Sequence, residues 1–238
     1  MPDFSTILIA LLLTLFAGLS TGIGAMISFF TRHTDTRLLA GALGLSAGVM
    51  IYISFMELMP EASEGLATVM PERTAAAAML AAFFGGIGLI ALIDWLVPAD
   101  ENPHEAHSME ELTDGHSHHK MKRTGIMLAM AIGIHNFPEG MATFISALDG
   151  LEMALPIVIA IAIHNIPEGI AVSVPIYHST GNRRKAFFYS LLSGLAEPAG
   201  ALVGMAFLLP LWSPVVNAVC LAVVAGIMVY IAFDELLP

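Results

Sequence analysis

Residues 47–60 read AGVMIYISFMELMP, and residues 225–238 read AGIMVYIAFDELLP. Nine of the fourteen aligned positions are identical, and the matches include Tyr, Glu and Pro as well as apolar residues. A coincidence of apolar composition does not explain why these polar and helix-bending residues recur at the same positions. We therefore predict that one structural unit occurs twice in the fold.

The composition of the whole chain excludes a water-soluble globule. Of 238 residues, 57% are hydrophobic and only 12% are charged, whereas a soluble domain carries about 25% charged residues. The chain nevertheless has 20 Asp and Glu against 9 Lys and Arg, so some carboxylates must lie in or beside apolar segments and need partners there. The acidic balance argues against nucleic acid as a partner, and the lone Cys220 excludes a disulfide framework or a cysteine-rich zinc module.

Seven apolar runs are long enough, at about 20 residues each, to cross a bilayer as helices. They predict an all-α integral membrane protein with a single polytopic domain over residues 1–238. The first run is too long for a cleavable signal peptide and has no basic residues before it. The predicted spans are about 4–30, 38–60, 74–97, 124–148, 153–178, 186–209 and 212–236.

Eight of the nine basic residues fall in alternate loops, and only Arg73 lies on the other side. The positive-inside rule makes those loops cytoplasmic and the N-terminus external. The second and seventh spans then cross in opposite directions, so the repeat is inverted, an architecture typical of transporters. The cytoplasmic cations are Arg32, Arg37, Lys120, Lys122, Arg123, Arg183, Arg184 and Lys185.

The predicted loop over residues 98–123 is polar, acidic and rich in histidine. It is interpreted either as a disordered cytoplasmic linker or as a weak metal-binding tract, and both descriptions can hold together. Neutral imidazoles at short spacing collect zinc-like ions, which makes His116, His118 and His119 the candidate ligands of this loop.

A second, shorter repeat lies on consecutive spans: HNFPEG at 135–140 and HNIPEG at 164–169. His135 lies twelve residues beyond Arg123, or about 18 Å at helical rise, near the middle of a hydrocarbon core of about 30 Å. His164 lies twelve residues past Glu152 and Glu197 twelve past Lys185, so three spans place polar side chains at one depth.

Within each motif, His and Glu are four residues apart and share one helix face, while Asn lies one position further round. Each acid also adjoins a proline, which removes one helical hydrogen bond and predicts a kink. The carbonyls freed by Pro138, Pro167 and Pro198 lie close to the polar layer. Non-ideal helix at the bilayer centre is tolerated where it lines a site.

Two imidazoles, three carboxylates and two amides suit a borderline divalent ion such as Zn²⁺, Fe²⁺, Mn²⁺ or Co²⁺. Seven ligands exceed one tetrahedral site, which favours two neighbouring ions bridged by Glu139 or Glu168. The alternative is a hydrogen-bonded network that joins the helices, which the duplication of the motif disfavours. The candidate metal ligands are His135, Asn136, Glu139, His164, Asn165, Glu168 and Glu197.

The two HNxPEG motifs, together with GLAEP at 194–198, resemble the ZIP (Zrt/Irt-like) divalent metal transporters, in particular their bacterial branch with His in both motifs. The resemblance implies an eight-span helical bundle in the cell membrane. It also implies uptake of Zn²⁺, and of Fe²⁺, Mn²⁺, Co²⁺ or Cd²⁺, into the cytoplasm. In this family the metal-binding spans and span one are expected to slide against the other spans.

The resemblance also implies how the candidate ligands divide between two metal sites. One site takes His135, Glu139, His164 and Glu168. The second takes Asn136, Asn165 and Glu197, with shared carboxylates. The sequence ends at Pro238, where the seventh span ends, so we expect a fragment that lacks the eighth span.

Acidic residues also lie at the predicted ends of the repeated spans. They are interpreted either as mouths that raise the local cation concentration or as solvated helix ends. The outer set is Glu57, Glu61 and Glu64, and the inner set is Asp234 and Glu235.

A divalent-metal importer is the leading functional hypothesis, with the metal as substrate and no organic cofactor. The alternatives are an intramembrane metal-dependent hydrolase and a metal exporter, since the residues alone do not give the direction of transport. The expected partners are divalent metal ions and the lipid bilayer, without nucleic acid, and a homodimer is also considered.

Overall fold

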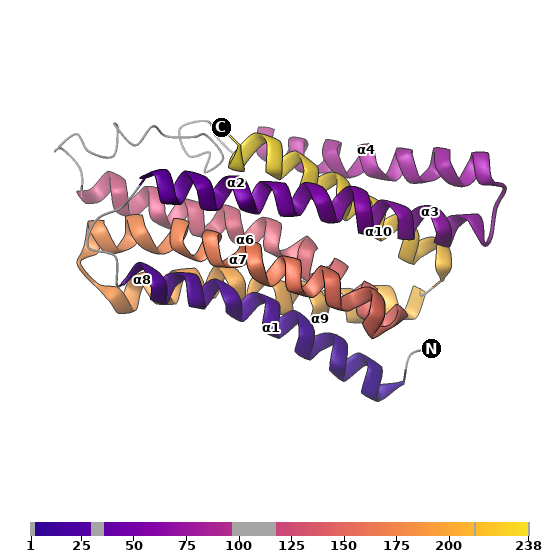
Figure 1. Ribbon diagram of the computed structural model, residues 1–238, viewed down its shortest axis with the longest axis horizontal. Coiled ribbons are helices and arrows are strands. Elements are labelled where there is room, and N and C mark those ends of the chain that lie inside the picture. Colours follow the sequence, from indigo (N-terminus) through magenta and orange to yellow (C-terminus); the bar gives the residue numbers. More distant parts are fainter. Residues whose placement is uncertain (1–2, 30–35, 97–117, 212, 238) are drawn as a thin grey trace.

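The computed structural model describes residues 3–29, 36–96, 118–211 and 213–237, and within these ranges the chain is helical, without strands. The helices run along a common axis in one elongated bundle (Figure 1). This confirms the predicted all-α class. The elements are α1 (Phe4–Ser28), α2 (Thr36–Ile53), η1 (Ser54–Leu58), α3 (Met59–Ala67), α4 (Glu72–Leu96), α6 (His118–Asp149), α7 (Leu151–Thr180), α8 (Arg183–Gly194), α9 (Ala196–Leu208), η3 (Leu209–Leu211), α10 (Pro214–Ile231) and η4 (Ala232–Leu236).

Six segments of the described chain are long and apolar enough to cross a membrane. The predicted fourth span is α6, which at 32 residues also has sufficient length but carries polar residues at its start and in its middle. The six apolar segments are Phe4–Ile27, Leu43–Ala67, Glu72–Leu92, Ala154–Thr180, Arg183–Phe207 and Pro214–Asp234.

Two predicted boundaries differ from the structure, and one predicted kink is present. The second span does not end at Pro60, because this proline stands in the first turn of α3, where its missing N–H is tolerated, and the helix runs on to Ala67. The loop predicted over 98–123 is helical from His118 onward. The sixth span is divided at Leu195 into α8 and α9, as expected from Pro198, which offers no N–H to the carbonyl of Gly194.

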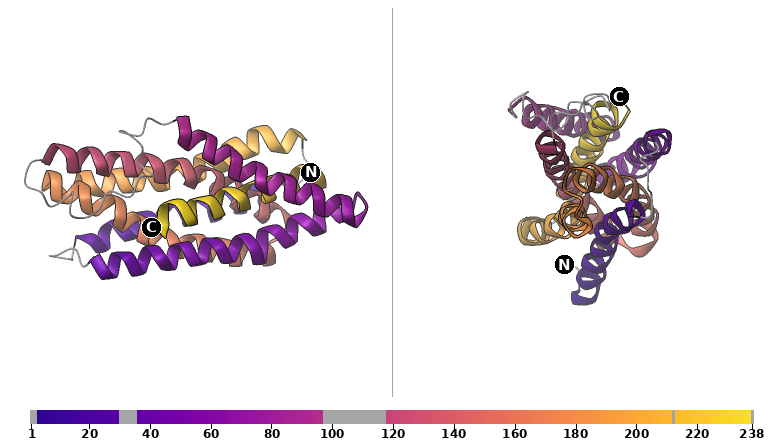
Figure 2. Two further views of the ribbon diagram at one scale, coloured as in Figure 1. Left: turned by 90° about the horizontal axis from the view of Figure 1, so that it is seen from above. Right: turned by 90° about the vertical axis from the view of Figure 1, so that its left-hand side faces the viewer.

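Helices α6 and α7 pack against each other and form the middle of the bundle, while α1 and α4 lie at its periphery (Figure 2). Helix α7 also packs against α1, α2 and α8, and α6 packs against α9 and α10. The two HNxPEG motifs therefore lie in the most enclosed part of the molecule.

The predicted repeat of the second and seventh spans is visible in the backbone. Both η1 and η4 are π-helical turns, and they occupy the same positions of the repeat, Ser54–Leu58 and Ala232–Leu236. A π-helical turn is rare and often marks a functional site. Its recurrence in both copies indicates that the repeat specifies local backbone geometry as well as composition.

Helices α1 and α8 cross at two glycines that contact each other reciprocally. A Cβ added to Gly18 would overlap the carbonyl of Gly194, and one added to Gly194 would overlap the carbonyl of Gly18. This contact reveals a further repeat, in which GLSTGIG at 18–24 corresponds to GLAEPAG at 194–200. The sequence analysis missed it, because only three of the seven residues are identical.

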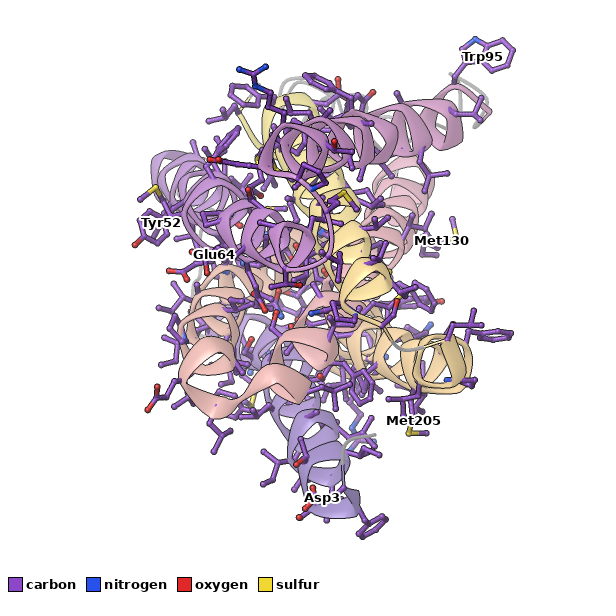
Figure 3. The ribbon with its side chains drawn as sticks, turned by 90° about the vertical axis from the view of Figure 1, so that its right-hand side faces the viewer. Asp3, Tyr52, Glu64, Trp95, Met130 and Met205 are labelled. Carbon is purple, nitrogen blue, oxygen red and sulfur yellow. The ribbon has the colours of Figure 1, made fainter. Side chains whose placement is uncertain are left out.

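Large apolar side chains cover the outside of the bundle. Trp95, Met130 and Met205 point away from the helices in Figure 3, and Trp95 is 79% exposed. Such extensive apolar surface suits contact with lipid rather than water. The interior by contrast contains the polar side chains, as expected when hydrocarbon surrounds the protein.

Candidate metal site

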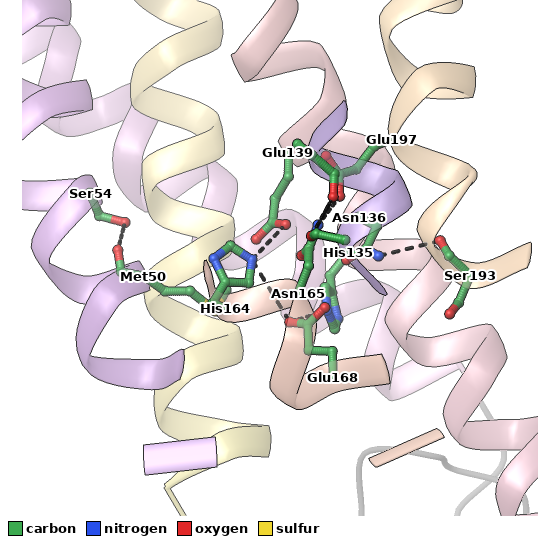
Figure 4. Close-up of polar contacts among 12 residues, drawn as sticks. Met50, Ser54, His135, Asn136, Glu139, His164, Asn165, Glu168, Ser193 and Glu197 are labelled. Carbon is green, nitrogen blue, oxygen red and sulfur yellow. Dashed lines mark hydrogen bonds and ion pairs between the residues drawn. The ribbon is translucent and has the colours of Figure 1, made fainter. Parts of the chain in front are cut away.

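The structure brings the seven predicted ligands together in the middle of the bundle. They come from α6, α7 and α9, and none of them is more than 1% exposed (Figure 4). These are the side chains that the residue count from the flanking charges assigned to one layer, and the structure brings them together. Burial of three carboxylates in one layer is costly unless each has a partner.

Two His–Glu pairs connect α6 to α7. Nε2 of His135 lies 3.2 Å from Oε1 of Glu168, and Nε2 of His164 lies 3.1 Å from Oε2 of Glu139. The sequence analysis expected His and Glu of the same helix to converge. For His164 the nearer partner is Glu139 on the other helix. The same-helix distance from His164 to Glu168 is 3.9 Å.

This cross-helix pairing follows from the opposite directions of α6 and α7. When two copies of a His-x-x-x-Glu motif face each other antiparallel, the His of one copy lies level with the Glu of the other. The two pairs are then related by the same inversion that relates the helices. One half of the layer contains His135 and Glu168, and the other contains His164 and Glu139.

The two asparagines bind equivalent backbone carbonyls. Nδ2 of Asn165 donates to the carbonyl of Ala17 on α1 at 2.9 Å, and Nδ2 of Asn136 donates to the carbonyl of Ser193 on α8 at 3.3 Å. Ala17 and Ser193 occupy matching positions, each just before the glycine at the α1–α8 crossing. Asn165 also donates to Oε1 of Glu197, so this asparagine and this carboxylate lie together in one half of the layer.

Several oxygen and nitrogen atoms of the layer have no hydrogen-bond partner among the described residues. A buried acceptor without a donor is expensive, so these atoms favour a cation or water as neighbour. They are Asn136 Oδ1, Glu139 Oε1, His164 Nδ1, Asn165 Oδ1, Glu168 Oε2 and Glu197 Oε2. Their chemistry, carboxylate and amide oxygen with imidazole nitrogen, matches that of ligands for a borderline divalent ion.

As the side chains stand, no three His, Cys, Asp or Glu residues in the described part of the chain are arranged to hold a metal ion. One oxygen of Glu139 and one of Glu168 is directed at a histidine instead. An ion that uses those histidine Nε2 atoms must therefore displace the His–Glu hydrogen bonds. In this conformation the Nε2 atoms of both histidines are therefore paired with carboxylates of the layer.

The other candidate residues are the acidic residues at the span ends and the histidines of the 98–123 segment, and they differ in exposure. Glu57 in η1 and Glu61 in α3 are half-buried, and Glu64 is exposed, as Figure 3 shows. Asp234 in η4 is exposed. His116 and the side chains of His118, His119 and Glu235 lie outside the described residues, and whether these groups form mouths or a loop site stays a prediction.

Helix α1 contributes groups to the layer that the sequence analysis did not identify. The carbonyl of Ala17 accepts from Asn165, and the carbonyl of Thr21 accepts from Ser190 Oγ at 3.4 Å. Ser190 also lies 3.1 Å from the carbonyl of Gly169. The spacing of Gly18 and Gly24, repeated at Gly194 and Gly200, was the available signal for this role of α1.

Comparisons with known proteins find a family model and several relatives that match this chain. Residues 96–238 match the family model of the ZIP zinc transporters. The chain is 56% identical to the zinc transporter ZupT of Nitratidesulfovibrio vulgaris, covering 100% of this chain and 89% of that one. It is also 56% identical to the ZupT proteins of Akkermansia muciniphila and Streptococcus mutans, with 98% and 96% of this chain and 87% and 86% of theirs covered.

Proposed function

The chain belongs to the ZIP zinc transporter family, and on this premise we propose that it carries Zn²⁺ into the cytoplasm through the buried layer of α6, α7 and α9. Family membership identifies a transporter rather than an enzyme, so the hydrolase alternative is not retained. Fe²⁺, Mn²⁺, Co²⁺ and Cd²⁺ are further proposed substrates, because the ligand set does not single out one borderline ion.

The observation that carries the proposal is the pair of inverted His–Glu contacts at the centre of a bundle covered by apolar side chains. A polar network that only joined helices would satisfy its own atoms. Here Glu139, Glu168 and Glu197 each keep one buried oxygen that has no hydrogen-bond partner in the part of the chain that the structure describes. These three oxygens are the groups that a divalent cation would neutralise.

The donors divide into two halves that support a binuclear site. Glu139, His164, Asn165 and Glu197 provide one half, while His135, Asn136 and Glu168 provide the other. This differs from the division that the family resemblance implied, which grouped the imidazoles in one site and the amides in the other. Either division leaves Glu139 and Glu168 between the ions as bridging carboxylates.

Alternating access is supported by the way in which the helices pack. The largest apolar cluster consists mainly of residues of α2, α3, α4 and α10, and it includes Ala17 of α1, Ala142 and Ile145 of α6, and Ile157 and Ile161 of α7. The buried residues of two smaller clusters lie on α1, α6, α7, α8 and α9 only. Apolar contact is non-directional, so the metal-binding helices are able to slide along this surface.

The topology that we propose has the N-terminus outside and the 98–123 segment in the cytoplasm, in one polytopic domain of the cell membrane. Glu57, Glu61 and Glu64 then lie toward the outer surface and Asp234 and Glu235 toward the inner one, where they attract cations. A homodimer is retained as a prediction about the assembly.

Zinc influx into proteoliposomes tests this function. Purified protein is reconstituted into vesicles that contain a zinc-responsive dye, and external Zn²⁺ is added with or without competing Fe²⁺, Mn²⁺, Co²⁺ or Cd²⁺. We expect saturable influx that these ions inhibit. Influx no faster than that of protein-free vesicles would refute transport by this chain.

A further inference from the structure

A cavity of about 400 Å³ lies between α6, α7 and α8, outside the central layer. It forms near the start of α6, the end of α7 and the start of α8, and Figure 1 shows these three helix ends at the same end of the bundle. Its volume falls in the range of sites that bind small molecules. Its walls include the apolar residues Ile126, Ile176 and Phe188 together with Arg184, Lys185 and Tyr189.

Two of the wall residues, Arg184 and Lys185, are cations without an ion-pair partner in the described part of the chain. The neighbouring Arg183 differs, because its guanidinium carbon lies 6.0 Å from the ring centroid of Phe29 and 5.8 Å from that of Tyr177. The cavity therefore offers two positive charges that no described acid neutralises. Such a pair attracts an anion, and a guanidinium binds a phosphate group through two parallel N–H bonds.

The same cavity has an apolar wall, which a site for a small free anion would not need. Phe188 is 60% exposed and lies one turn of α8 beyond Arg184. A phenyl ring with that exposure is unfavourable in water and suits contact with hydrocarbon. Cations beside an exposed aromatic ring therefore fit an amphipathic anion, with its charged group at Arg184 and Lys185 and its apolar part along Phe188.

The distance from the central layer places this cavity at the membrane surface. With the polar layer at the middle of the bilayer, as the sequence predicts, Lys185 lies twelve residues from Glu197, or about 18 Å at helical rise. The hydrocarbon reaches about 15 Å from the midplane and the headgroups about 20–22 Å. We therefore expect Lys185 to be level with lipid phosphates and Phe188, about 4.5 Å nearer the midplane, with the start of the acyl chains.

The turn between α7 and α8 fixes the start of α8. Gly181 has a φ of 63°, a left-handed conformation that glycine adopts without strain, and Oδ1 of Asn182 accepts from the backbone N of Lys185 at 3.1 Å. The hydroxyl of Thr180 donates to the carbonyl of Ile176 at 2.6 Å and accepts from the backbone N of Asn182 at 3.2 Å. The backbone that carries the two cations is thus ordered before a ligand binds, which lowers the cost of binding.

We propose that this cavity binds an anionic phospholipid of the cytoplasmic leaflet, with its phosphate group at Arg184 and Lys185 and an acyl chain along Phe188. The topology proposed above puts this end of the bundle on the cytoplasmic side, where basic pockets between spanning helices bind lipid headgroups. A zwitterionic lipid has the same phosphate, but its own ammonium group is repelled by the two cations. The inference goes beyond the transport of zinc and does not require it.

Native mass spectrometry of the purified protein tests the proposal. The protein is titrated with phosphatidylglycerol or phosphatidylcholine carrying the same acyl chains, and separately with glycerol 3-phosphate and inorganic phosphate. We expect the first phosphatidylglycerol to bind roughly 5- to 30-fold more tightly than phosphatidylcholine, since each cation near a membrane surface contributes about fivefold. The two soluble phosphates should not bind at the same concentrations.

The double variant Arg184→Gln/Lys185→Gln should bind both lipids equally. The matched control is Arg73→Gln/Arg183→Gln, which also removes two charges, neither of them from the wall of the cavity. It should keep the preference of the parent protein for phosphatidylglycerol. Phe188→Ala keeps both charges and should weaken the binding of both lipids by roughly three- to tenfold, because apolar contact is lost.

Four results would overturn the inference. They are equal binding of the two lipids by the parent protein, a parent-like preference in Arg184→Gln/Lys185→Gln, a lost preference in the control, and binding of a soluble phosphate as tight as that of phosphatidylglycerol. If Arg184→Gln/Lys185→Gln is not recovered folded, Phe188→Ala decides, and unchanged lipid affinity there contradicts the proposal. Zinc influx is measured separately, so a failure of the proposed function leaves these binding results standing.

Discussion

Nε2 of His135 lies 3.2 Å from Oε1 of Glu168 on the antiparallel neighbouring helix. The contact is repeated by His164 and Glu139, and together the two pairs join α6 to α7 at the centre of the bundle. Each histidine therefore contacts a carboxylate of the other copy of the motif. The two copies therefore form one cluster of polar side chains between them.

The carboxylates of these pairs should be required for zinc binding. Replacing Glu139 or Glu168 by Gln keeps the shape and removes the negative charge. We expect each variant to lower zinc affinity by roughly 10- to 100-fold or more, since even groups that only support a metal ligand contribute that much. Isothermal titration of purified protein in detergent measures the change.

Glu152→Gln is the matched control for this series, because Glu152 lies exposed at the start of α7. It should bind zinc as the parent protein does. Equal affinities for Glu168→Gln and Glu152→Gln would contradict the assignment.

The two halves of the layer should hold one ion each. His135→Ala removes the imidazole of one half and His164→Ala that of the other. We expect the parent protein to bind two zinc ions and each variant to bind one tightly. Elemental analysis after gel filtration measures the stoichiometry, and a single tightly bound ion in the parent protein would refute the binuclear proposal.

The helix break in the sixth span should position Glu197. Pro198→Ala restores an N–H that can bond to the carbonyl of Gly194, so α8 and α9 should join into one continuous helix and turn Glu197 away from Asn165. We expect slower zinc influx with unchanged or higher thermal stability. Pro156→Ala in α7, at an exposed position, is the control, and a normal influx rate in Pro198→Ala would show that the break is not needed.

A residue larger than glycine at the crossing of α1 and α8 should lower the stability of the protein. Gly18→Ala places a methyl group against the backbone of α8, which typically costs about 1–3 kcal/mol when a packed interface must shift. The control is Gly133→Ala, where the nearest atom to the new Cβ lies at 3.8 Å, an ordinary contact. Thermal unfolding in detergent should show a lower midpoint for Gly18→Ala only, and equal midpoints would contradict this packing.

The meeting of the seven side chains could be predicted from the sequence, because helical rise puts residues at equal distances from the flanking charges at one level of neighbouring helices. The rotation of each helix could not, so the 3.2 Å contact of His135 with Glu168 on the other helix was not foreseen. Pro198 predicted the break at Leu195, whereas the helix that contains Pro60 runs on to Ala67. A proline interrupts a helix only where its position demands a hydrogen bond that it cannot make.

The contribution of α1 was missed for a different reason. Ala17 and Thr21 both accept hydrogen bonds through their backbone carbonyls, from Asn165 and Ser190, and neither residue type marks a site in a sequence. Their counterparts Ser193 and Glu197 lie on α8 and α9, and of these two only Glu197 was predicted as a ligand. Only the contact of Gly18 with Gly194 shows that the two segments correspond.

X-ray absorption at the zinc edge is the measurement that tests the central claim most directly. Zinc-loaded parent protein should show imidazole back-scattering together with oxygen ligands, and the double variant His135→Ala/His164→Ala should lose the imidazole contribution. An imidazole signal that persists unchanged in the double variant would mean that zinc binds to other histidines, and the inverted His–Glu layer would not be its site.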